Sequence, residues 1–112
     1  MLNAKNIILN QIIRSTYLKP KYIVPCAAAS LFAVIYANGD VYPCEILNNP
    51  LGNLRKYGMD FMRLWDTREV KECRVFIRNT RCNCVYGCAW TINIISNLVF
   101  LPRLVYNFVK QI

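Results

Sequence analysis

Six cysteines constrain this chain of 112 residues more than any other feature of its sequence. They are Cys26, Cys44, Cys73, Cys82, Cys84 and Cys88, and the last three share the segment RCNCVYGC. The chain is 55% hydrophobic, so it can form a core. A chain this short nevertheless buries a smaller fraction of its surface than a larger domain does. We therefore expect the cysteines to stabilise the fold through disulfides or a bound metal, or the chain to dock on a larger protein.

The amino-terminal segment indicates whether disulfides or a metal site are favoured. An even number of cysteines permits a disulfide framework, which requires a secretory route. Polar residues interrupt the apolar run at the amino terminus, and no small-residue cleavage site closes it, so it does not fit a secretory signal. Its isoleucine spacing predicts an amphipathic helix over residues 2–18, ended before Pro20. We expect a cytoplasmic protein, in which cysteine clusters more often bind metal than form disulfides.

A β-hairpin is the clearest local prediction. The runs LFAVIYA (31–37) and DVYPCEI (40–46) flank Asn38-Gly39, a dipeptide that suits the positive φ angles of a two-residue hairpin turn. Pro43 cannot donate a hydrogen bond to a ladder. The second strand should therefore be an edge strand or leave the sheet near that residue.

The rest of the chain is predicted to consist of helices joined by turns, which makes the fold a small α+β domain. Thr67 is expected to cap a helix with Val70, Cys73 and Ile77 on its inner face. Cys73 is interpreted there as a core residue, since an unligated cysteine behaves as a small hydrophobe. Trp65 and Trp90 are likewise expected to be core anchors. The other predicted segments are a turn over 48–53, a helix from about residue 60, an irregular loop over 80–88 and a helical tail over 89–112, broken at Pro102.

Charge and composition exclude several functions. The net charge is +8, but the 14 basic residues are scattered and form no stripe, so we expect no nucleic-acid partner. Arg74, Arg78 and Arg81 are expected to be mainly exposed. The absence of histidine excludes mixed Cys/His zinc ligation and acid–base chemistry by an imidazole.

The apolar tail raises the question of a membrane. Asn93, Asn97 and Arg103 interrupt it, and it contains no run of the ~20 apolar residues that a spanning helix needs. Contact with a membrane surface is the less favoured interpretation, because burial against another protein explains the same residues. A membrane partner is therefore not expected.

The cysteine spacing favours a metal centre built from two segments. Folding of the hairpin would bring Cys26 and Cys44 towards the same end of the ribbon, and the loop with Cys82, Cys84 and Cys88 can supply further thiolates. Such a donor set suits a tetrahedral zinc ion or an iron–sulfur cluster. Paired C-x-x-C knuckles, which structural zinc sites favour, are absent, and the C-x-C spacing favours a cluster. A structural zinc module for protein–protein contact remains the alternative, and a basic disulfide-stapled protein is a third.

The order of these residues resembles a known family. Twelve residues separate Cys26 from Gly39 and four separate Gly39 from Cys44, within a strand–turn–strand run that ends in Pro-Cys. This resembles the opening motif of the SPASM/twitch auxiliary-cluster domains of radical S-adenosylmethionine enzymes. PLGNL, FMRLW and RNTRCNCVYGC resemble the same family. The resemblance implies a linking helix to a missing barrel over 1–22, a cluster-binding domain over 23–92 and an apolar helical tail over 93–112.

The resemblance also implies a cofactor and its ligands. Cys26 and Cys44 match the hairpin ligands, and Cys84 and Cys88 match the late pair. The fuller family pattern has seven cysteines and can hold two clusters. This chain has six cysteines, so one [4Fe–4S] cluster is expected here. With Cys82, five thiols remain for four positions, and the residues do not decide whether Cys82 or Cys84 is spare.

The resemblance further implies that the catalytic part of the enzyme lies elsewhere. The C-x-x-x-C-x-x-C loop of the catalytic cluster is absent from the chain. S-adenosylmethionine is therefore expected only in the parent enzyme, and the chain is not expected to be catalytic alone. The implied partners are a radical S-adenosylmethionine barrel domain or subunit and a peptide substrate.

Overall fold

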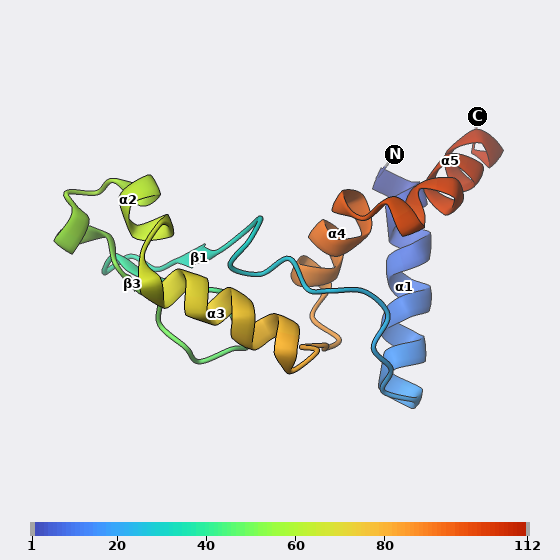
Figure 1. Ribbon diagram of the computed structural model, residues 1–112. Coiled ribbons are helices and arrows are strands. Elements are labelled where there is room, and N and C mark those ends of the chain that lie inside the picture. Colours follow the sequence, from blue (N-terminus) through green and yellow to red (C-terminus); the bar gives the residue numbers. More distant parts are fainter. Residues whose placement is uncertain (1, 112) are drawn as a thin grey trace. The chain divides into compact units, whose positions relative to one another are not determined.

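The computed structural model describes residues 2–111, which form two compact units (Figure 1). One unit contains the residues up to Cys26 and those from Cys82 onward, and the other is Ala27–Arg81. Helices occur in both units, and a small antiparallel sheet lies in the second. This combination confirms the predicted small α+β fold.

The Ala27–Arg81 unit is built on a three-stranded sheet. Its strands are β1 (Val34–Ile35), β2 (Asp40–Tyr42) and β3 (Gly52–Asn53), in the order β1-β2-β3. Val34 pairs with Tyr42, and Val41 pairs with Gly52. The strands are shorter than predicted, and the prediction of a turn over 48–53 is wrong at β3. Because β2 is the central strand, it ends directly before Pro43, which could not continue the ladder.

The hairpin has a three-residue loop and not the predicted two-residue turn. The N–H of Gly39 donates to the carbonyl of Tyr36 and the N–H of Tyr36 to that of Asp40, both at 2.9 Å. Gly39 has a φ of +92°, whereas Asn38 has no positive φ and accepts the N–H of Asp40 with its side chain at 3.0 Å. A Cβ on Gly39 would lie 2.9 Å from Oδ1 of Asn53. Glycine is therefore required at this position by conformation and by space.

Three helical segments follow the sheet. They are η1 (Leu54–Tyr57), α2 (Phe61–Trp65) and α3 (Arg68–Asn79). Asp60 caps α2, since its Oδ1 accepts the N–H groups of Met62 at 3.1 Å and Arg63 at 3.3 Å. Thr67 occupies the cap position of α3, but its side chain does not cap the helix, because its hydroxyl donates to the carbonyl of Leu64 at 2.7 Å. The predicted inner face of Val70, Cys73 and Ile77 is buried. The predicted helices and the orientation of α3 are thereby confirmed.

The other unit is a helical cluster. It contains α1 (Leu2–Leu18), α4 (Gly87–Ser96), η2 (Leu98–Phe100) and α5 (Leu101–Lys110), coloured from blue to red in Figure 1. Helix α1 has the predicted bounds. The buried residues that hold these helices together are Ile8, Ile12, Val24, Trp90, Ile94 and Phe100. The burial of Trp90 confirms its prediction as a core anchor.

The predicted break of the helical tail at Pro102 is wrong, because the tail breaks at Asn97. Asn97 has an extended backbone, and its Oδ1 accepts the N–H of Val99 at 3.0 Å, which starts a new helical turn. Pro102 lies in the first turn of α5. A proline is tolerated there because an N–H in the first turn has no helical partner.

No single helix among residues 2–111 is long and apolar enough to cross a bilayer. The segments Gly87–Ser96 and Leu98–Lys110 reach the necessary length and composition only as a pair, which is bent by 81°.

Candidate metal centre

Cys44 lies just beyond the central strand of the sheet. Its side chain is buried, and its Sγ accepts the backbone N–H of Leu47 at 3.2 Å. The hydrogen bond closes a short turn that begins at the cysteine. Hydrogen bonds from backbone N–H groups to sulfur are typical of cysteine ligands in iron–sulfur proteins.

Cys73 is the second thiol of the Ala27–Arg81 unit. It is 1% exposed on the inner face of α3, which confirms its prediction as a core residue. Burial raises the pKa of the Cys73 thiol, a hydrogen bond with Asn49 lowers it, and charge on Cys44 raises it. Sequence patterns do not indicate that these two thiols interact, because 28 residues separate them along the chain.

The late cysteine loop is attached to α4. Cys82 and Cys84 are half-buried, and Sγ of Cys84 accepts the N–H of Tyr86 at 3.4 Å. The indole N–H of Trp90 donates to the carbonyl of Cys84 at 2.6 Å. Because Trp90 is part of the core, this hydrogen bond fixes the loop backbone against a rigid helix.

The remaining two candidate ligands are more accessible. Cys88 is exposed in the first turn of α4, so the predicted irregular loop over 80–88 ends before it. Cys26 is half-buried in the segment that follows α1. Both are thiols in this structure.

Arg74 has a structural role, contrary to its predicted exposure. Its Nε donates to the carbonyl of Ala29 at 2.6 Å and its Nη2 to that of Trp65 at 3.3 Å. The guanidinium also lies 5.0 Å from the centre of the Trp65 ring, as in a cation–π contact. Arg74 is consequently half-buried, whereas Arg78 and Arg81 are exposed as predicted.

The described residues contain no ready-made metal cage. Among residues 2–111, no three Cys, Asp or Glu side chains gather closely enough to hold a metal ion. Four of the predicted ligands, Cys26, Cys82, Cys84 and Cys88, belong to the helical unit, and Cys44 belongs to the other. The ligand set therefore stays a prediction.

The donor chemistry fits an iron–sulfur cluster. All candidate ligands are thiols, no imidazole is available, and backbone N–H groups face the sulfurs of Cys44 and Cys84. Thiolates with N–H donors are the usual environment of such clusters.

Comparison with known families indicates which kind of thiol-rich domain this is. Residues 26–89 match the family model of SPASM, an iron–sulfur cluster-binding domain. The match covers more than half of the chain and contains all six cysteines. The chain belongs to the SPASM family. No curated protein and no solved structure matches it.

Proposed function

We propose that the chain is the auxiliary-cluster domain of a radical S-adenosylmethionine enzyme that modifies peptides or proteins. It holds one [4Fe–4S] cluster and works in the cytoplasm with a barrel domain or subunit that binds S-adenosylmethionine. The ligands are four of the five cysteines Cys26, Cys44, Cys82, Cys84 and Cys88.

The family match carries this proposal, because it joins the hairpin cysteines and the late cysteine loop in one cluster-binding domain. The N–H groups that face Cys44 and Cys84 support it. In iron–sulfur proteins, hydrogen bonds from backbone N–H groups to the ligand sulfurs influence the reduction potential of the cluster.

A bound cluster would supply one-electron transfer, or an open iron position for a substrate if only three thiolates ligate it. The chain's own residues position the cysteine ligands. The turn from Cys44 to Leu47 and the Trp90 hydrogen bond hold ligand-bearing backbone in place. Such positioning limits the rearrangement that accompanies electron transfer.

Anaerobic reconstitution with iron and sulfide tests the cluster. We expect a broad absorption band near ~400 nm and about four irons and four sulfides per chain. Replacement of Cys44 or Cys88 by alanine should lower the iron content, whereas Cys73→Ala should not. Cys73 is a matched control, because it is a cysteine within the same family match but outside the proposed ligand set. A colourless protein that holds one zinc ion would contradict the proposal and favour a structural zinc module.

A second experiment tests the need for a barrel. The reconstituted chain, reduced with dithionite, should not cleave S-adenosylmethionine. Cleavage by the chain alone, with the iron content unchanged, would show that the catalytic centre lies within it and would contradict the proposed division of labour.

A further inference from the structure

Helix α5 presents an apolar face to solvent. Leu101, Val105, Phe108 and Val109 recur at the spacing of one helical face, and each is between 45% and 62% exposed. The preceding turn continues this surface, with Leu98 80% exposed. No residue of α5 is buried. Exposed apolar side chains that form one continuous surface indicate an interaction site, whereas scattered ones do not.

The opposite side of α5 faces its own unit. Leu104 packs against the core of the helical unit, and Asn107 is half-buried. Arg103 donates a hydrogen bond to the side-chain oxygen of Gln11 on α1. In most surface helices the apolar face is turned inward. Here Leu104 and the polar residues Arg103 and Asn107 face the protein body while the larger apolar face is directed outward, as in a helix that lies between a protein and a lipid surface.

The charge of this unit is entirely positive. The residues up to Cys26 and from Cys82 onward contain six Lys and Arg residues and no Asp or Glu. All six acidic residues of the chain lie in the Ala27–Arg81 unit. A surface without carboxylates is attracted to anionic lipid headgroups, and each added Lys or Arg strengthens that attraction.

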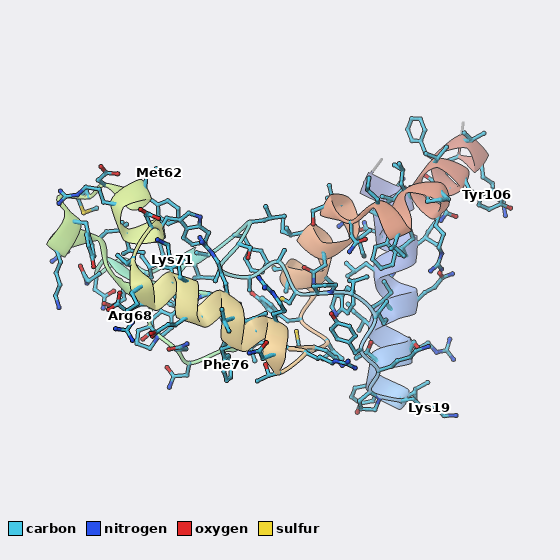
Figure 2. The ribbon with its side chains drawn as sticks, in the orientation of Figure 1. Lys19, Met62, Arg68, Lys71, Phe76 and Tyr106 are labelled. Carbon is cyan, nitrogen blue, oxygen red and sulfur yellow. The ribbon has the colours of Figure 1, made fainter. Side chains whose placement is uncertain are left out.

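A shallow hollow lies between α1 and the polar side of α5. Its volume is about 320 Å³, and its lining residues are Gln11, Pro102, Arg103, Tyr106 and Asn107. It contains a guanidinium, two amides and a phenol, all of which can donate hydrogen bonds to a phosphate. Tyr106, labelled on α5 in Figure 2, is 64% exposed, and tyrosine is a residue typical of the membrane–water interface.

We infer that η2 and α5 dock the domain on an anionic membrane surface. The side chains of Leu98, Leu101, Val105, Phe108 and Val109 enter the boundary between headgroups and acyl chains. Arg103 and Lys110, on the other side of the helix, remain at the level of the lipid phosphates. This position is compatible with a cytoplasmic protein, since the cytoplasmic leaflet carries anionic lipids.

The charge argues against a second copy of the chain as the partner. Two such units placed face to face would bring together surfaces that both lack carboxylates, and like charges across an interface oppose association. This inference revises the interpretation from sequence, which favoured a protein as the cover of the tail. The reason is the outward orientation of the apolar face, which periodicity alone does not specify.

Flotation of the full chain with lipid vesicles tests the inference. The probes are vesicles of phosphatidylcholine alone and vesicles of phosphatidylcholine with phosphatidylserine, at about 0.1 M salt. The chain should float with the anionic vesicles, and the bound fraction should fall as salt is raised. Phe108→Asp and Val105→Asp should each weaken binding at least about tenfold. Lys110→Gln should weaken binding to anionic vesicles about fivefold.

Phe76→Asp on α3 is the matched control. Phe76 is 46% exposed and Phe108 is 45% exposed, and Phe76 is also labelled in Figure 2. Its replacement should leave vesicle binding unchanged. The inference is overturned if the chain fails to float, if Phe108→Asp binds like the unmodified chain, or if Phe76→Asp is equally impaired. It is also overturned if the apolar face forms a dimer that Phe108→Asp dissolves while no vesicles are bound.

Discussion

The indole nitrogen of Trp90 lies 2.6 Å from the backbone oxygen of Cys84, so one side chain joins the cysteine loop to the core of the helical unit. The indole ring is 2% exposed, and its packing with Ile8 and Ile94 leaves it little freedom to move. The hydrogen bond therefore positions the backbone of Cys84 against the core. We expect folding of the helical unit to favour cluster binding by this loop.

Trp90→Phe should weaken both properties. Phenylalanine keeps most of the packing but leaves the Cys84 carbonyl without its indole donor, so we expect a loss of about 1–3 kcal/mol in the free energy of unfolding. Reconstituted iron per chain should fall as well. Trp65→Phe is the control, because Trp65 contacts Arg74 and Phe61 and lies outside the cysteine loop. Equal iron content in the two variants would contradict the proposed role of Trp90.

The hydrogen bond from Tyr86 to the sulfur of Cys84 should affect the reduction potential of a bound cluster. Tyr86 has a φ of −74°, which proline adopts without strain, so Tyr86→Pro removes the N–H donor at little conformational cost. Reduction adds negative charge that N–H donors stabilise. Tyr86→Pro should therefore lower the potential below that of Tyr86→Ala, which keeps the N–H. Redox titration followed by absorption measures both variants, and identical potentials would argue against a role for this hydrogen bond.

Local patterns predicted the helices because their causes are local. The bounds of α1 follow from its isoleucine spacing and from Pro20, and the burial of Val70 and Ile77 follows from their spacing along α3. Strand β3 was not predictable in this way. Gly52 and Asn53 resemble turn residues. They form a strand because the backbone of β2, the carbonyl of Asn38 and the side chain of Asp40 are available to them.

The candidate site shows the same limit. Helical spacing was sufficient to place Cys73 in the core, whereas the thiol-rich metal centre that cysteine spacing predicts stays a prediction. Neither pattern indicated that Leu47 and Tyr86 direct N–H groups at sulfur, since these contacts depend on loop backbone angles. The interaction of Cys73 with Cys44 and the inward position of Arg74 likewise arise from packing between distant segments.

Asn53 should stabilise the hairpin that carries Cys44. Its Nδ2 donates to the carbonyl of Asn38 at 3.1 Å and to Asp40 at 2.9 Å, and its Oδ1 accepts the N–H of Arg55 at 2.9 Å. Asn53→Ala removes all three hydrogen bonds, so we expect a loss of about 1–3 kcal/mol, measured by urea unfolding. Asn48→Ala should change stability by less than about 0.5 kcal/mol, because Asn48 is exposed. A similar loss in both variants would show that Asn53 has no special role.

Cys73 should make the metal-free chain less stable at alkaline pH. Burial raises the pKa of this thiol above its ordinary value of 9.0. Below that pH the thiol is protonated in both the folded and the unfolded chain, so it does not change the free energy of unfolding. As the pH rises through about 9, the unfolded chain releases the proton while the folded chain retains it, so the free energy of unfolding decreases. The decrease continues until the pH reaches the pKa of the folded state.

Cys73→Val removes the titrating group from this buried position and should flatten the decrease. Cys88→Ala is the control, because Cys88 is exposed and its loss should leave the slope unchanged. Urea unfolding under argon, with a thiol reductant, at about pH 7 and about pH 10 gives the change in stability for each variant. Contributions from the other ionisable groups are common to all variants and cancel in the comparison. A slope that is equally steep in Cys73→Val would mean that the Cys73 thiol ionises as readily in the folded chain as in the unfolded one.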